Sequence, residues 1–141
     1  MKDLSRNFLP VISFKDGART TATNGQVIVD LQGFEGALIV IQSGTITDGT
    51  LYTFELKEGD AANLSDAAAV ADADLVSGGP TKGDLEPSFA AADDDTVKWF
   101  GYRGSKRYLR IDLATVTGSP STGGHFIGTV IKGYPKHGPV L

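Results

Sequence analysis

The sequence contains no cysteine and no long apolar run. Without cysteine, the chain can form neither disulfides nor thiolate-based zinc sites. No stretch approaches the ~20 consecutive apolar residues of a membrane helix. The start, MKDLSRNFLPVISF, lacks the uninterrupted apolar core of a signal peptide. We therefore expect a soluble protein that is made in the cytoplasm and has no membrane association.

Positive charge is also scarce. The 13 Lys and Arg residues are outnumbered by 17 Asp and Glu residues, so the formal net charge is −4. Nucleic-acid-binding domains usually present a basic face to the phosphates. The charge balance therefore argues against nucleic acid as a partner.

The residue patterns of catalytic and metal sites are missing as well. His125 and His137 are the only imidazoles, and they form no HExxH pair. There is no GxSxG, GxxxxGK[ST] or GxGxxG stretch, and the acids of 55–66 have no neighbouring base. The run DDD at 93–95 lacks the EF-hand spacing, so it is interpreted as a solvated loop, with calcium binding left open. We expect no enzyme, no cofactor and no resident metal.

Glycine and proline, by contrast, are frequent: 18 and 6 in a chain of 141 residues. This length suits one domain, and such punctuation favours short strands joined by turns over long helices. The predicted strands are FLPVISF (8–14), QVIVDLQ (26–32), ALIVIQSG (37–44), LYTFELKE (51–58), VKWFGY (97–102), RYLRIDLA (107–114) and GHFIGTVIKG (124–133).

Alternation within these strands predicts which side chains face the core. Pro10 places 8–14 at a sheet edge or in an arm. The run 37–44 is apolar throughout, which is typical of a strand buried on both faces. RGSK at 103–106 predicts a hairpin between its flanking strands. The predicted core positions are Val27, Val29, Leu31, Tyr52, Phe54, Leu56, Leu109, Ile111 and Leu113, with Tyr108, Arg110 and Asp112 facing outward.

Together these features predict an all-β protein, an antiparallel β-sandwich or barrel of jelly-roll-like type. Residues 1–25 form an N-terminal arm and edge strand, 26–133 a single β-domain, and 134–141 an extended tail. The long excursion 59–96 can hold a short helix, because Leu64, Ala68, Ala71 and Leu75 recur at helical spacing. Its small residues can lie flat against a neighbouring chain.

Aromatic and basic residues concentrate in WFGYRGSKRYLR (99–110), and the tail KGYPKHGPVL (132–141) is stiffened by two prolines. Arg and aromatic residues are favoured at protein interfaces, and a stiff tail loses little entropy on docking. A frayed tail remains an alternative. The candidate interface residues are Phe8, Pro10, Trp99, Tyr102, Arg103, Arg107, Arg110, Tyr134, Pro135, His137 and Pro139.

The segment GYRGSKRYLRIDL (101–113), the TGSPSTGG loop and the closing GYPKHGPV resemble small virion proteins of tailed bacteriophages. The resemblance covers about residues 37–140. It implies a structural protein of the virion, made in the host cytoplasm, most simply a decoration protein on the major capsid protein. A neck or tail position (tail tube, terminator or head completion) is the alternative. The expected partners are virion subunits and further copies of the chain, a trimer among the possibilities. From the residues alone, a carbohydrate-binding module with Trp99, Tyr102 and Tyr108 as its sugar platform also stays open.

Overall fold

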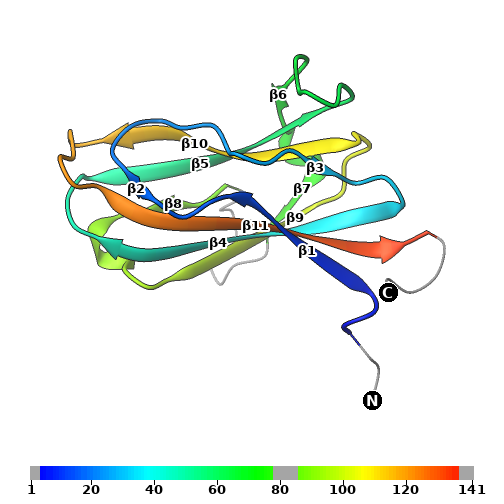
Figure 1. Ribbon diagram of the computed structural model, residues 1–141, viewed down its shortest axis with the longest axis horizontal. Helices are drawn as coiled ribbons and strands as arrows, with labels where there is room; N and C mark the ends of the chain where they lie inside the picture. Colours follow the sequence, from blue (N-terminus) through cyan, green and yellow to red (C-terminus); the bar gives the residue numbers. More distant parts are fainter. Residues whose placement is uncertain (1–3, 78–85, 137–141) are drawn as a thin grey trace.

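Strands of alternating polarity build two antiparallel sheets that pack face to face in the computed structural model (Figure 1), which describes residues 4–77 and 86–136. The six-stranded sheet has the order β1 (Phe8–Phe14), β11 (Gly124–Pro135), β4 (Phe34–Ile46), β9 (Val97–Tyr102), β7 (Leu75–Ser77), with β2 (Ala18–Arg19) beside β11. The five-stranded sheet has the order β3 (Val29–Asp30), β10 (Tyr108–Thr117), β5 (Leu51–Gly59), β6 (Ala68–Ala69), with β8 (Ser88–Phe89) beside β5.

The pairing order of each sheet runs between two edge strands: β1 and β7 in one sheet, β3 and β6 in the other. A closed barrel would have no such edges. Among the described residues, the fold is therefore the sandwich rather than the barrel of the two predicted alternatives. The edge position of β1, predicted from Pro10, is confirmed.

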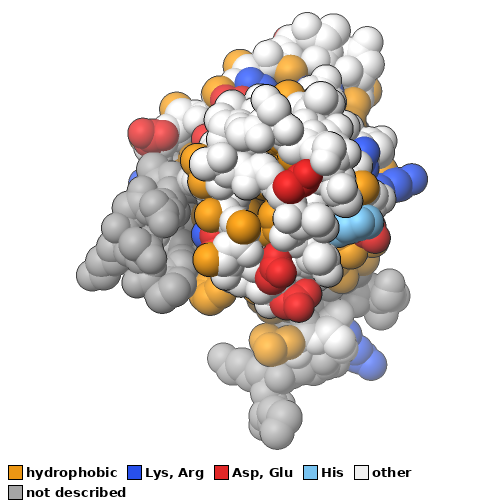
Figure 2. Space-filling view, turned by 90° about the vertical axis from the view of Figure 1, so that its left-hand side faces the viewer, with side chains coloured by type: hydrophobic (Ala, Val, Ile, Leu, Met, Phe, Trp, Pro, Cys, Tyr) orange, Lys and Arg blue, Asp and Glu red, His pale blue; other side chains and the backbone are white. Residues whose placement is uncertain are grey.

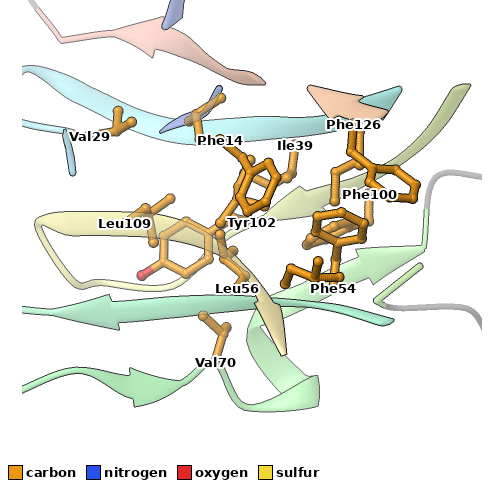
Figure 3. Packing of buried hydrophobic residues seen from close by; sticks show 14 of the residues in the cluster. Phe14, Val29, Ile39, Phe54, Leu56, Val70, Phe100, Tyr102, Leu109 and Phe126 are labelled. Atoms are coloured by element: carbon orange, nitrogen blue, oxygen red, sulfur yellow. The ribbon is translucent and has the colours of Figure 1, made fainter. Parts of the chain in front are cut away.

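The core lies between the two sheets, where the inward side chains of both converge (Figure 3). Phe54 of β5 is central: its ring centroid lies 5.4 Å from that of Phe14 and 5.2 Å from that of Phe126. The predicted core faces of β5 and β10 are confirmed, because their six apolar residues are all 0–1% exposed.

The predicted hairpin at 103–106 is wrong. Strand β9 pairs with β4 and β7, whereas β10 pairs with β3 and β5, so this segment crosses from one sheet to the other. It wraps around the hydroxyl group of Tyr102, which accepts a hydrogen bond from the Lys106 backbone N–H at 3.1 Å. A Cβ atom at Gly104 would lie only 2.5 Å from this hydroxyl, so the crossing requires glycine there.

The short helix expected within 59–96 is also wrong for the described part of that range. Its only helical segments are two three-residue 3₁₀ turns, η1 (Asp72–Asp74) and η2 (Ala91–Asp93). Leu64 has a φ angle of +51°, which an α-helix does not allow. The Asp66 carboxylate instead accepts the N–H groups of Asp60 and Ala61 and closes a loop before β6. This segment stands above the sandwich in Figure 1.

Residues 8–25 are part of the sandwich and not an arm. Strands β1 and β2 both pair with β11, and Thr23 bridges to Leu113 of β10. Phe14 is fully buried in the core.

The predicted boundaries of two other strands also shift. Segment 26–32 contains only the two-residue strand β3, although Val29 and Leu31 are buried as predicted. At the other end of the chain, β11 continues to Pro135, which pairs with Phe34. The first two residues of the predicted tail are therefore in the sheet.

Candidate interaction surface

The outer face of the six-stranded sheet carries two rows of side chains that cross its strands. Strand register places them side by side. The first row is Pro10, Ile131, Leu38, Gly101 and Val76; the second row is Ile12, Thr129, Val40 and Trp99. We call these two rows the apolar face.

Side chains of the apolar face are accessible to solvent although none is charged. Ile12 is 50% exposed, Trp99 39% and Leu38 38%. The outer face of the five-stranded sheet differs, since Lys57 and Glu55 form an ion pair on it at 2.9 Å. The end of the sandwich in Figure 2 also differs, because acidic side chains lie beside the hydrophobic ones there. An exposed apolar patch on one face of a monomer commonly marks an interaction site.

Strand β4 explains how this surface arises. Its apolar run was predicted to be buried on both faces, and this is wrong. Ile39 and Ile41 are fully buried in the core, whereas Leu38 is exposed and Val40 is half-buried on the outside. The strand therefore has the composition of a doubly covered strand, but the described part of the chain covers only one of its faces.

Next to the first row lies a hollow of about 360 Å³. Glycines 36, 101 and 133 line it. A Cβ atom at Gly36 would lie 3.4 Å from the Tyr134 ring and one at Gly133 would lie 3.0 Å from the Phe8 ring, so these glycines let the two rings approach the backbone. Phe8 and Tyr134 are among the residues around it. Two charged residues of opposite sign, Glu35 and Arg103, also line the hollow.

Five of the predicted interface residues lie at this surface. Pro10 and Trp99 are in the two rows, and Phe8, Arg103 and Tyr134 line the hollow. Among the large hydrophobic residues that the structure describes, Tyr134 is the most exposed, at 74%.

Other predicted interface residues lie elsewhere. Pro135 is half-buried at the end of β11. Tyr102 is in the core at 3% exposure, and its hydroxyl donates to Glu58 Oε2 at 2.7 Å. Burial and this hydrogen bond raise the pKa of Tyr102 well above its usual value. His137 and Pro139 lie outside the described residues.

The basic residues of 106–110 are used within the fold. Lys106 pairs with Asp60 at 2.6 Å, and Arg107 pairs with Asp30 at 2.8 Å. The hydrogen bond from Arg107 lowers the pKa of Asp30. These two basic side chains are therefore engaged by acids of the same chain.

Arg110 and Asp112 form a third pair, at 2.6 Å. Asp112 was predicted to face outward into solvent, but it is only 3% exposed. It is covered by the backbone at Gly25, whose N–H donates to its carboxylate at 2.8 Å. Gly25 is needed for this close approach, since a Cβ atom there would lie 2.3 Å from the Ile111 carbonyl oxygen.

The three aromatic residues of the predicted sugar platform do not share a face. Trp99 points outward from the six-stranded sheet, whereas Tyr102 points into the core. Tyr108 is on the five-stranded sheet, with the Arg107 guanidinium 5.0 Å from its ring centroid. The carbohydrate interpretation therefore loses its geometric basis.

The acidic residues that the sequence singled out have structural partners. Asp93 accepts the backbone N–H of Ala90 at 2.8 Å, and Asp94 accepts that of Ile46 at 2.8 Å. The Nδ1 atom of His125 lies 3.1 Å from a carboxylate oxygen of Asp16. Within residues 4–77 and 86–136, no three His, Asp or Glu side chains converge as a metal site would require.

The same ranges contain no helix with the length and apolar character needed to cross a membrane.

Seven of the nine residues of the apolar face were not among the predicted interface residues, namely Ile12, Leu38, Val40, Val76, Gly101, Thr129 and Ile131. The sequence of 37–41 already indicated this surface, because the residues that point to one side of the strand and those that point to the other are all apolar. It could be interpreted correctly only once the number of sheets that cover this strand was known.

No protein-family model matches the chain, and neither does any curated protein.

Proposed function

We propose that this protein is a structural subunit that acts by packing against other protein chains, and that it is not an enzyme. The observation that carries the proposal is the apolar face, an uncharged surface across five strands of one sheet. A sheet face of this kind gains free energy when another protein surface removes it from water.

Its proposed place is the virion of a tailed bacteriophage, as a decoration protein that binds the major capsid protein. The support is the resemblance of 101–113 and of the closing GYPKHGPV to small phage virion proteins. A neck or tail position, such as tail tube, terminator or head completion, is the alternative within the same class.

The physics of a repeated shell suits a small protein with an interaction surface of limited size. Each contact can be weak, because many copies engage a symmetric lattice together and effective concentration strengthens the assembly. Such a subunit requires preformed surfaces rather than a catalytic site. The pairing of the basic residues with acids of the same chain fits this role, since rigid outer surfaces lose little entropy on docking.

The test is the protein composition of purified particles, measured by quantitative mass spectrometry. A decoration protein should occur in roughly the same copy number as the major capsid protein. Six or twelve copies, the order typical of ring-shaped neck and tail parts, would select the alternative position. If the chain is absent from particles, the virion role is refuted.

A further inference from the structure

We propose that the apolar face binds a second copy of this chain, sheet against sheet, about a two-fold axis. In this arrangement Trp99 of each copy occupies the hollow of the other. The inference deepens the proposed structural role by naming the partner of the same face, and it rests on that role.

The absence of charge from both rows favours a second copy of the chain as the partner. Neither row of the apolar face contains a charged residue, so packing two copies together desolvates no charge in either row. A different protein would need an equally uncharged sheet face to avoid burying unpaired charges. A second copy of the chain meets this condition because it presents the same two uncharged rows. Glu35 and Arg103, which line the hollow, lie outside the two rows and have opposite signs.

The shape of the apolar face also favours a second copy. Trp99 projects from β9 and is 39% exposed, whereas Gly101 lies two residues further along the same strand and helps to form the hollow. The hollow of about 360 Å³ is within the range of small-molecule pockets and ample for one aromatic side chain. The chain thus carries a protruding side chain and a matching recess on one face, about 7 Å apart along the strand.

Symmetry then relates these two features. A two-fold axis that lies in the interface, crosses the strands and passes between the two rows exchanges one row with the other. Trp99 then faces Gly101 of the second copy, and Leu38 faces Val40 of the second copy. Strands of the two copies run nearly antiparallel, as in sheets packed at about 30° in β-sandwiches.

Size sets the expected strength. The two rows cross five strands spaced ~4.8 Å apart and lie ~7 Å from each other along the strands, so with their side chains they present roughly 24 × 14 Å in projection, about 340 Å². A stable interface buries about 800 Å² of accessible surface per partner. The accessible surface of this corrugated face is larger than its projected area, but the area buried per partner still falls at the low end of the range for stable interfaces. We therefore expect a reversible dimer whose population depends on concentration.

The test uses the full chain in sedimentation velocity from about 1 µM to about 1 mM, a range that brackets weak association. Wild type should convert from monomer to dimer. Leu38→Asp should weaken association by about 100-fold or more, since each dimer would bury two unpaired charges. Leu51→Asp is the matched control, because Leu51 is 37% exposed on the other sheet, against 38% for Leu38. It should dimerise like wild type, and circular dichroism checks that both variants fold.

Trp99 is the only tryptophan in the chain, so its fluorescence reports on the proposed contact directly. Emission should shift to shorter wavelength and resist acrylamide quenching as the dimer forms. A wild type that stays monomeric with unchanged emission would overturn the proposal. So would a trimer, or an equal loss of association in both aspartate variants.

The experiment on purified particles and the dimerisation experiment can fail separately, because they test different claims. A monomer that is nevertheless found in particles would refute the second copy as partner and retain the structural role. A two-fold dimer that occurs in no particle would support the contact while refuting the virion placement.

Discussion

Replacing Ser13 by alanine should lower the free energy of unfolding substantially, although the substitution removes only one hydroxyl group. Ser13 is fully buried on β1, at the edge of the six-stranded sheet. Its Oγ donates to the Val27 carbonyl oxygen at 2.8 Å and accepts the Ile111 N–H at 3.0 Å. One hydroxyl group thus joins β1 to β10 of the other sheet and to the segment before β3.

The magnitude follows from what the substitution leaves behind. Alanine would leave the buried Ile111 N–H without its partner, which costs about 1–3 kcal/mol, and the Val27 carbonyl would add a smaller penalty. We expect a total of about 2–4 kcal/mol. For a chain of this length, that corresponds to a melting temperature lower by about 8–16 °C, at about 4 °C per kcal/mol.

Equilibrium urea unfolding followed by circular dichroism measures the effect. The midpoint should fall by about 1–2 M if the m-value is about 2 kcal/mol/M. Protein concentration is held equal and low, because self-association would raise the apparent stability. Ser65→Ala is the matched control: Ser65 is exposed, and exposed substitutions usually change stability by less than about 0.5 kcal/mol. If Ser13→Ala shifts the midpoint no more than Ser65→Ala, the inter-sheet role of this hydroxyl group is wrong.

Two further predictions concern pH. Burial raises the pKa of Glu86 above 4.5, although the hydrogen bond from the Leu56 N–H acts in the opposite direction. The contribution of Glu86 to stability is therefore fully present below pH 4.5 and is lost as the pH rises through the pKa of the folded state. Glu86→Gln should therefore be more stable than wild type at pH 7, and the two urea midpoints should diverge as the pH rises above 4.5; midpoints that stay parallel would refute this. Hydrogen bonds from the backbone N–H groups of Gly123, Thr122 and Ser121 lower the pKa of Asp48 from 3.8 to about 2, so its contribution is present above pH 3.8 and fades as the pH falls toward 2. Asp48→Asn should speed amide exchange at Thr122 and Gly123 at neutral pH, and unchanged exchange would show that the carboxylate does not hold this loop.

Several features of the fold could be predicted from local patterns. Period-two alternation in 51–58 and 109–113 identifies the buried side chains correctly, because successive side chains of a strand point to opposite faces. Pro10 indicates an edge strand for a similarly local reason, since proline lacks the N–H that a central strand needs. The frequent glycine and proline residues indicate short strands and turns.

Other features depend on contacts between distant residues, and there the predictions failed. RGSK looks like a hairpin turn, but the strands it joins belong to different sheets, and the hydroxyl group of buried Tyr102 accepts a hydrogen bond from the segment that crosses between them. The helical spacing in 64–75 is overridden by the loop that Asp66 closes. The strand pattern predicts that Asp112 faces solvent, but in the structure the segment containing Gly25 covers it.

By itself, the sequence determined that the protein is all-β and which side chains alternate toward the core. It could not determine which strands pair, because pairing depends on residues far apart in the chain. Leu38 and Val40 show the consequence most clearly. Their apolar character is plain in the sequence, but only the tertiary structure places them on an outer face that no second sheet covers within residues 4–77 and 86–136. Local periodicity specifies the two faces of a strand, and the packing of layers decides which of them is left for a partner.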